Sequence, residues 1–204
     1  MRVELPAVIA LGSNLGDREQ TLRDAVRAID ALPGVVVSAA SEIVESPALK
    51  PDGVDESAPS YLNAVIGVRS AISPEQLLDG LNEIEQRLGR VRTERWGDRT
   101  IDLDIITAAR PHKNNDRLTL PHPRAWQRGF VLVPWAQLNP AAQLPGHGPV
   151  AGLAAATTDV VLPYPAAPLM SALRSGGASG SATGDLAAGD PAAAGTVPGP
   201  GRRP

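Results

Sequence analysis

The sequence predicts an α+β fold, in which one antiparallel sheet carries two helices. Two stretches have apolar residues at the spacing of an amphipathic helix, and each is followed by a glycine that can end it. Around them lie runs with alternating apolar residues or many β-branched residues, which are typical of strands. Along the chain these elements alternate as strand, helix, strand, strand, helix and strand.

The first three elements lie before residue 46. Residues 6–11 form a short apolar run that enters a glycine-containing turn, which indicates a buried strand. Asp17 can cap the helix that follows, and Pro33 with Gly34 ends it. The apolar stripe of this helix consists of Leu22, Ala25, Val26 and Ile29. Residues 35–45 are rich in β-branched residues, so we expect a second strand there.

A long loop separates the two halves of the domain. Residues 46–60 are rich in proline and polar residues, and a loop of this length inside a compact domain is often a functional lid. A third strand is expected at residues 61–68. Ser73 and Gln76 then form a capping box around Pro74, which begins a second helix. Its apolar stripe is Leu77, Leu78, Leu81, Ile84 and Leu88, and Gly89 ends it.

The order of these elements is that of a ferredoxin-like sandwich, with a mostly antiparallel four-stranded core sheet and two helices. The fourth strand is residues 100–107, and another helix is expected at residues 130–138. We expect the domain to cover residues 1–164. More than half of residues 165–204 are glycine, alanine or proline, so we expect a disordered C-terminal tail.

The composition argues against several classes of protein. The 204 residues have a formal charge of −3 and no cysteine, which leaves no overall basic field for nucleic acid and no thiolate chemistry. We find no signal peptide and no apolar run long enough for a membrane span. We therefore expect a soluble cytoplasmic protein. A monomer is a separate expectation, which does not follow from the composition.

The most informative part of the chain places arginines directly before two aspartates. Guanidinium groups donate paired hydrogen bonds to phosphate oxygens and keep their charge. Paired carboxylates suit Mg²⁺, which often shares its ligands with substrate phosphates. The combination is typical of nucleotide-dependent phosphoryl transfer. The residues are Arg90, Arg92, Arg95, Arg99, Asp102 and Asp104.

Strand periodicity brings the two carboxylates together. Ile101, Leu103 and Ile105 alternate with Asp102 and Asp104, so both aspartates should point to one face of a strand while the aliphatic residues enter the core. At about 7 Å between such positions, the pair could hold two metal ions. The alternative is a solvated strand face whose acids pair with the neighbouring arginines.

Seven stretches, in this order, resemble the 6-hydroxymethyl-7,8-dihydropterin pyrophosphokinases of folate synthesis. Each is a weak signal alone, but together they cover roughly residues 5–160. The resemblance implies transfer of the β,γ-pyrophosphoryl group of ATP to the pterin hydroxymethyl oxygen, with release of AMP. The stretches are residues 10–17, 61–64, 90–92, 95–97, 99–105, 117–122 and 128–130.

The resemblance also implies roles for individual residues. Asp102 and Asp104 would bind two Mg²⁺ ions, and Arg90 and Arg99 would contact the transferring phosphates. Further residues would surround ATP, which is the co-substrate: Glu85, Arg92, Trp96, Ile105, Arg117, Thr119, His122 and Arg128. The pterin would contact Ser46, Pro47, Leu49, Tyr61, Asn63 and Phe130.

The pterin assignments also make physical sense. Tyr61 and Phe130 could stack on the flat ring, although single aromatic residues in apolar strands usually fill the core. Tyr61 and Asn63 share a strand face, and the Asn63 amide can match a pterin edge.

Two of the ATP-site residues have alternative interpretations. His122 could be a general base, but we favour phosphate contact because the reaction needs charge neutralisation more than deprotonation. Glu85 could equally be a solvated acid on its helix.

Two other functions remain open from the sequence. A ferredoxin-like domain could bind RNA or sense a ligand, but an RNA-binding sheet needs exposed aromatic residues and a basic surface, and this chain has 3% aromatic residues. A catalytically silent relative could bind pterin only, against which the intact aspartates and arginines argue. For the enzyme, we expect direct in-line transfer without a covalent intermediate.

Overall fold

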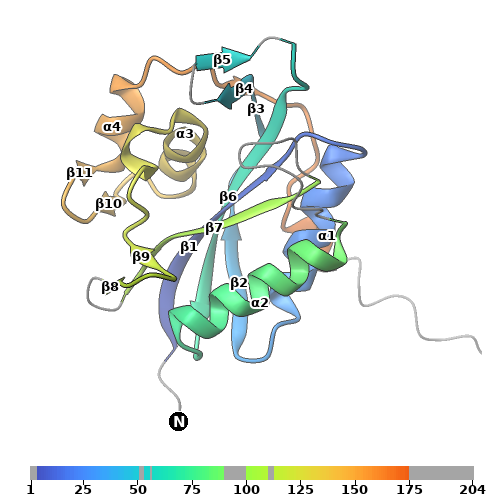
Figure 1. Cartoon of the computed structure of the whole chain (residues 1–204), viewed down its shortest axis with the longest axis vertical. Coiled ribbons are helices and arrows are strands. Elements are labelled where there is room, and N and C mark those ends of the chain that lie inside the picture. The colour runs from blue at the N-terminus through green and yellow to red at the C-terminus, as the bar shows by residue number, and fades with distance from the viewer. Residues whose placement is uncertain (1–3, 51–52, 56, 90–99, 110–112, 175–204) are drawn as a thin grey trace, which may run out of the picture.

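The computed structural model describes residues 4–50, 53–55, 57–89, 100–109 and 113–174. Its centre is an antiparallel sheet in which β1 (Leu5–Ser13) lies between β6 (Tyr61–Ser70) and β7 (Asp102–Ala108). The strand order is β12-β3-β6-β1-β7, in which β12 is Leu162–Pro163 and β3 is Val44–Ser46. Strand β2 (Val35–Ala40) also pairs with β6 (Figure 1). The α+β fold with an antiparallel sheet is therefore confirmed.

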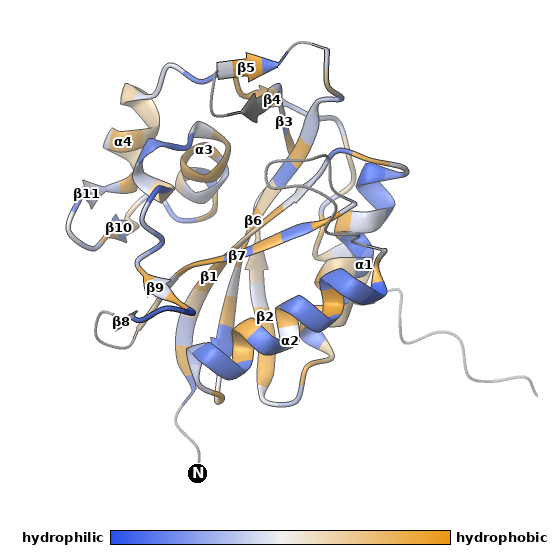
Figure 2. Ribbon diagram, viewed as in Figure 1, coloured by the Kyte–Doolittle hydropathy of each residue, from blue (hydrophilic) through white to orange (hydrophobic). Residues whose placement is uncertain are grey.

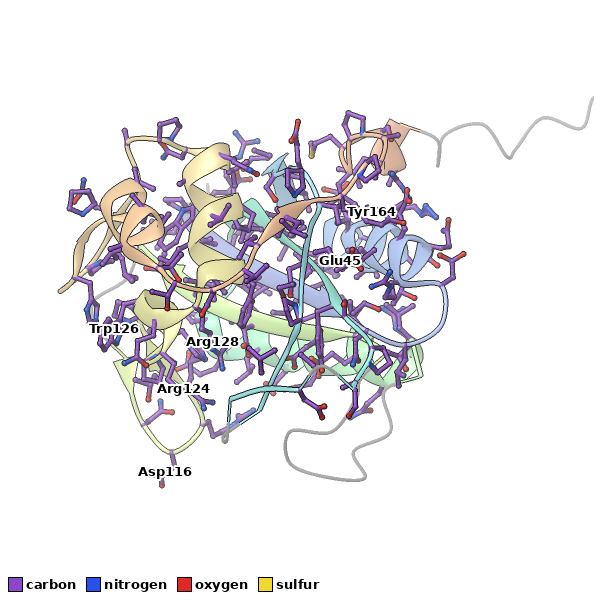
Figure 3. All side chains as sticks on the ribbon, turned by 90° about the horizontal axis from the view of Figure 1, so that it is seen from above. Glu45, Asp116, Arg124, Trp126, Arg128 and Tyr164 are labelled. Atoms are coloured by element: carbon purple, nitrogen blue, oxygen red, sulfur yellow. The ribbon has the colours of Figure 1, made fainter. Side chains whose placement is uncertain are left out.

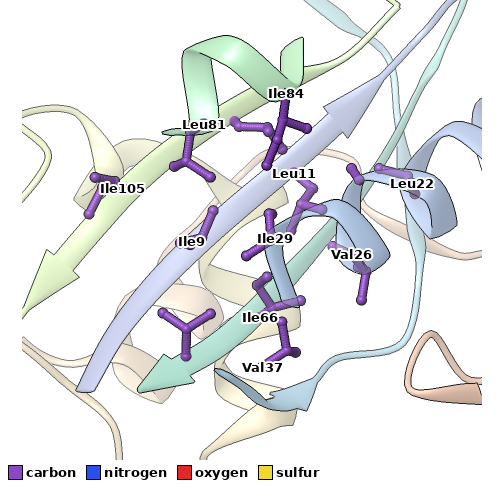
Figure 4. Packing of buried hydrophobic residues seen from close by; sticks show 14 of the residues in the cluster. Ile9, Leu11, Leu22, Val26, Ile29, Val37, Ile66, Leu81, Ile84 and Ile105 are labelled. Carbon is purple, nitrogen blue, oxygen red and sulfur yellow. The ribbon is translucent and has the colours of Figure 1, made fainter. Parts of the chain in front are cut away.

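Helices α1 (Arg18–Asp30) and α2 (Pro74–Arg87) cover one face of the sheet (Figure 1). The predicted caps are present: the Asp17 carboxylate accepts from the Gln20 N–H, and Ser73 forms its capping box with Gln76. Each helix turns its apolar stripe toward the sheet and its charged side outward (Figure 2). Their buried residues meet those of β1 and β6 in the main core, where Ile9, Leu22, Ile66 and Leu81 are completely buried (Figure 4).

A third layer, which we did not predict, covers part of the opposite sheet face. It contains the 3-10 helix η1 (Ala125–Gln127), helix α3 (Gly129–Leu138) and helix α4 (Val150–Ala156). Helix α3 is at the position expected from the sequence. This layer forms a second apolar cluster with the sheet, made of Ala10, Val65, Ile106, Ala125, Val131, Leu132, Trp135, Ala142, Leu144 and Val150. Two apolar faces explain why β1 and β6 are buried along most of their length.

The predicted strand at residues 35–45 is two strands. It ends after Ala40 and resumes as β3 (Val44–Ser46), and both pieces pair with β6. Ser41 lies at the break, where its hydroxyl accepts from the Val65 N–H and its own N–H donates to the Val65 carbonyl. These hydrogen bonds satisfy the backbone of Val65 in β6, opposite the gap between β2 and β3.

The expected loop at residues 46–60 contains regular structure. Strands β4 (Ala48–Lys50) and β5 (Gly53–Asp55) form a small antiparallel hairpin there. Two further hairpins are formed by β8 (Lys113–Asn114) with β9 (Thr119–Leu120), and by β10 (Gln143–Leu144) with β11 (Gly148–Pro149). The first of these precedes the third layer and the second lies within it.

The C-terminal part of the described chain returns to the sheet and to α1. Strand β12 (Leu162–Pro163) pairs with β3, and α5 (Ser171–Arg174) packs against α1. The Arg23 guanidinium donates to the Ala167 carbonyl at 2.6 Å, and Leu169 is buried in the main core. The packed region thus continues past the expected domain end at residue 164.

Within the described parts of the chain, none of the helices combines the length and the apolar character needed to cross a membrane.

Candidate active site

Asp102 and Asp104 lie on β7 and point to the sheet face opposite the main core. Their neighbours Ile101, Leu103 and Ile105 are buried in that core beneath the helices, as the alternation in the sequence predicted. Both carboxylates are partly exposed, unlike the aliphatic residues between them. The predicted common face for the two acids is therefore present in the structure.

The neighbouring strand leaves room beside these carboxylates. On β1, Gly12 is in register with Asp102 and Ala10 is in register with Asp104. Both β1 residues are small, so β1 itself places no large side chain beside either acid. On its other side Gly12 is in register with Asn63 of β6, which makes Asn63, Gly12 and Asp102 one row across three strands.

Gly12 is needed for this row because Asn63 comes close to it. A Cβ atom at position 12 would lie 3.1 Å from Asn63 Oδ1 and 3.7 Å from Tyr61 Cδ1. Asn63 is almost fully buried, and its amide donates to the Ser46 hydroxyl at 2.9 Å. Ser46 faces Tyr61 across the β3–β6 pair. The structure thus brings together Ser46, Tyr61 and Asn63, three residues predicted to contact pterin.

Arg128 and Phe130 come from the start of α3. The Arg128 guanidinium lies 3.2 Å from Asp104 Oδ2 and 5.5 Å from the centre of the Phe130 ring. A guanidinium over an aromatic face is a favourable cation–π contact. Figure 3 shows Arg128 beside α3, on the same side of the molecule as Arg124 and Trp126. Arg128 therefore connects the aspartate strand with the Phe130 ring.

His122 faces the same carboxylate. Its Nε2 lies 3.8 Å from Asp104 Oδ2, and its backbone N–H donates to the Ile106 carbonyl. Burial lowers the pKa of His122 and outweighs the raising effect of Asp104, while the charges of Arg128 and Arg124 lower it further. The imidazole is therefore mostly neutral at pH 7. Nδ1 accepts from the Arg124 N–H, which leaves the proton on Nε2, the nitrogen that faces Asp104.

Glu85 is a buried acid on α2 and not a solvated one. It is 3% exposed, and its Oε1 accepts from the Leu103 N–H at 2.8 Å. Leu103 lies between the two aspartates on β7, the last strand of the sheet. The carboxylate therefore fixes α2 to the part of β7 that presents Asp102 and Asp104.

The other described ATP-site candidates are Ile105, Arg117 and Thr119, and each has a different environment. The Ile105 side chain is in the main core, so only its backbone can face a nucleotide. Arg117 lies in the β8–β9 hairpin and forms an ion pair with Asp79 of α2. Thr119 follows on β9, which contacts β7.

Part of the predicted site lies outside the described residues: Arg90, Arg92, Arg95, Trp96 and Arg99. For Leu49 the structure describes only the backbone, which is in β4, and Pro47 lies between β3 and β4. Two neighbours of the site residues were absent from our sequence-based assignment of the site: Gly12 as a spacer, and Asp79 as the partner of Arg117. A small residue between two strands gives a weak signal, and pairings between distant residues give none.

Comparison with known proteins gives one consistent family. A family model described as 7,8-dihydro-6-hydroxymethylpterin-pyrophosphokinase (HPPK) matches residues 8–140. A 2-amino-4-hydroxy-6-hydroxymethyldihydropteridine pyrophosphokinase of Bacillus subtilis is 42% identical over 132 residues, which cover 65% of this chain and 77% of that protein. The protein of the same name from Haemophilus influenzae is 40% identical over 141 residues, covering 69% and 86%.

Solved structures agree at the level of the fold. A wild-type Plasmodium falciparum HPPK-DHPS has a TM-score of 0.55 at 13% identity, with 74% of this chain and 44% of that chain covered. An HPPK-DHPS crystallised in complex with substrates has a TM-score of 0.58 at 12% identity, covering 75% and 43%. The present chain thus spans less than half the length of those proteins.

Proposed function

This chain belongs to the 7,8-dihydro-6-hydroxymethylpterin pyrophosphokinase family, and we infer that it transfers pyrophosphate from ATP to 6-hydroxymethyl-7,8-dihydropterin. The products are AMP and the pterin pyrophosphate, a step in folate synthesis. The chain is thus an ATP-dependent diphosphotransferase. The observation that carries this conclusion is the family match over residues 8–140, which includes the strand with Asp102 and Asp104.

Asp102 and Asp104 are the residues that would hold Mg²⁺. Two carboxylates on one strand face, with small residues beside them on β1, fit a hard cation that prefers oxygen ligands. In the described ranges no group of three or more acidic, histidine or cysteine side chains could hold a metal ion alone. Substrate phosphate oxygens would therefore complete the coordination of the two ions that we expect. Bound there, Mg²⁺ would neutralise charge on the triphosphate.

The basic and neutral donors near Asp104 would bind the ATP phosphates. Arg128 supplies a guanidinium fork at the edge of the carboxylates, and His122 supplies a neutral Nε2–H donor. A protonated Nε2 argues against His122 as a general base toward a substrate on that side. We assign the same phosphate-binding role to Arg90 and Arg99, and nucleotide contacts to Glu85, Arg92, Trp96, Ile105, Arg117 and Thr119.

The pterin would lie between Phe130 and the row of Asn63, Gly12 and Asp102. Asn63 and Ser46 are joined by a hydrogen bond, which holds the Asn63 amide in one orientation toward a heterocyclic edge. Tyr61 and Phe130 are both half-buried aromatic residues that can stack on a flat ring. Pro47 and Leu49 would add contacts from the β3–β4 segment.

The mechanism is then a direct in-line attack of the pterin hydroxyl on the β-phosphorus of ATP, with AMP as the leaving group. Nothing in this scheme requires a covalent enzyme intermediate. The protein's contribution is to orient both substrates and to supply fixed positive charge and hydrogen-bond donors where charge develops. Closure of residues 46–60 over the substrates would exclude water, the competing acceptor.

The test is AMP release from ATP by the purified protein. We expect AMP formation to require both Mg²⁺ and hydroxymethyl-dihydropterin, with equal amounts of pterin pyrophosphate formed. Binding of the pterin without any AMP would indicate a catalytically silent relative. AMP release that is independent of pterin would indicate an ATP hydrolase and contradict the proposal.

Four sequence-based expectations stay predictions at this point. The order β2-β6-β1-β7 supports a ferredoxin-like core inside the larger sheet. The tail predicted for residues 165–204 lies outside the described residues from position 175 onward, and limited proteolysis can test it. A monomer and a cytoplasmic location are also proposed, and the first can be measured by light scattering.

A further inference from the structure

Asp159 lies outside the part of the chain that matches the family model, yet it contacts the start of α3. The Asp159 carboxylate accepts from the Gly129 N–H at 2.7 Å. The two residues are separated by 30 positions in the sequence, and Asp159 follows α4. Gly129 directly follows Arg128 and directly precedes Phe130.

The start of α3 has a backbone donor that needs this partner. The first N–H groups of a helix have no acceptor within the helix. Arg128 is the N-cap residue of α3, and its side chain makes no capping hydrogen bond. Asp159 supplies the missing acceptor from another segment, and its negative charge also suits the positive end of the helix dipole.

Asp159 is itself held in place, and Gly129 is shaped for its approach. The Asp159 N–H donates to the Thr157 hydroxyl, and Thr157 is the C-cap residue of α4, which packs against α3. A Cβ at Gly129 would lie 2.7 Å from Asp159 Cβ and 2.9 Å from Thr157 Oγ1. Such distances require the backbone to move, so the contact depends on glycine at position 129.

We propose that Asp159 is a positioning residue for the transfer reaction, acting through Arg128 and Phe130. Those two side chains leave the backbone on either side of Gly129: Arg128 reaches Asp104, and the Phe130 ring lies under the Arg128 guanidinium. When Asp159 holds Gly129, it sets where the helix begins and hence where both side chains point. This inference rests on the proposed function, since it assigns the position of that site's residues.

The experiment compares Asp159→Ala and Asp159→Asn with wild type in the AMP assay, with KM for each substrate, kcat and thermal unfolding measured together. For Asp159→Ala we expect both KM values to rise about three- to thirtyfold, the range that corresponds to loss of a helix cap. Asparagine keeps a neutral acceptor, so Asp159→Asn should recover part of the loss. Gly129→Ala should reproduce the Asp159→Ala kinetics.

The matched control is Asp24→Asn, which makes the same chemical change on the exposed side of α1. A purely structural role for Asp159 would lower the unfolding temperature but leave both KM values of the folded protein unchanged, and that result would overturn the inference. If Asp159→Ala does not fold, unchanged KM values in Asp159→Asn and Gly129→Ala would overturn it equally. A wild-type protein that releases no AMP would instead refute the function on which the inference rests.

Discussion

The guanidinium of Arg128 lies 3.2 Å from the carboxylate of Asp104 and also covers the ring of Phe130. One side chain therefore touches the proposed metal-binding strand and the proposed pterin-stacking residue. Only 14% of the Arg128 side chain is exposed, against 36% for Asp104, so the cation is more deeply buried than the acid. In the substrate complex that we propose, the same guanidinium would exchange part of its contact with Asp104 for a phosphate.

Replacement of Arg128 should therefore impair ATP binding. We expect Arg128→Ala to raise the ATP KM about tenfold or more, because a hydrogen bond to a charged group contributes about 1.5–3 kcal/mol. Arg128→Lys keeps the charge but loses the planar fork and the stacking on Phe130, so it should recover little. Steady-state kinetics at saturating pterin measure both effects. Arg27→Ala, on the exposed side of α1, is the control, and wild-type kinetics for Arg128→Lys would contradict the role of the fork.

Asp102→Asn and Asp104→Asn should each stop turnover without unfolding the protein. Each substitution keeps the size of the side chain and removes a metal-binding charge, and a metal ion contributes several kcal/mol to charge stabilisation, so we expect a loss of about a hundredfold or more in kcat. Circular dichroism checks the fold, and the dependence of rate on Mg²⁺ concentration checks the cause. A near-normal rate in either variant would remove that carboxylate from the metal site.

Local patterns in the sequence predicted much of the fold. The caps at Asp17 and Ser73 and the alternation along β7 depend on neighbouring residues, and all three appear in the structure. The break at Ser41 and the third layer depend on distant contacts. At the break, Ser41 forms hydrogen bonds with the backbone of Val65, and this contact leaves no periodic signal in the local sequence. The packing of α3 on the second face of the sheet leaves little signal either.

The candidate site shows the same division. Tyr61, Asn63, Asp102 and Asp104 could be placed on strand faces because side chains alternate every two residues. The burial of Glu85 could not be predicted, since it depends on a hydrogen bond from the backbone N–H of Leu103, 18 positions later in the sequence. Asp79 and Arg117 are also far apart in the sequence, and only the folded structure shows that they form an ion pair.

The ion pair between Asp79 and Arg117 should compete with ATP for the arginine. Both side chains are more than half exposed, and exposed pairs contribute at most about 1 kcal/mol, so Asp79→Asn should lower the ATP KM by no more than about fivefold. Arg117→Ala should raise it. Kinetics at low and high salt provide the measurement, because screening should reduce the difference between Asp79→Asn and wild type. If Asp79→Asn raises the KM, the acid positions Arg117 and does not compete for it.

Enlargement of Gly12 should affect the pterin more than ATP. In Gly12→Ala the new methyl group lies 3.1 Å from Asn63 Oδ1, so the Asn63 amide must move from its hydrogen bond with Ser46. We expect pterin affinity to fall about fivefold or more, in keeping with overpacking costs of about 1–3 kcal/mol. Titration with a pterin analogue, with and without an ATP analogue, measures the loss.

Gly67→Ala is the matched control for this variant. Gly67 is on the same strand as Asn63, and its new methyl group would lie 3.4 Å from the Ser38 hydroxyl, an ordinary contact. We expect no change in pterin affinity for Gly67→Ala. Equal losses in the two variants would mean that the effect at Gly12 is a general one on the sheet.

Glu85 should contribute to both stability and catalysis through the same hydrogen bond. Glu85→Ala removes the acceptor of the Leu103 N–H, and an unsatisfied buried donor costs about 1–3 kcal/mol, so the free energy of unfolding should fall by that amount. Because Leu103 lies between Asp102 and Asp104, kcat should fall as well. Glu85→Gln retains an acceptor and should recover most of both losses.

Urea unfolding and the AMP assay measure the two effects, with Glu83→Ala on the exposed side of α2 as the control. A fall in stability with an unchanged kcat would show that the position of β7 does not depend on this carboxylate.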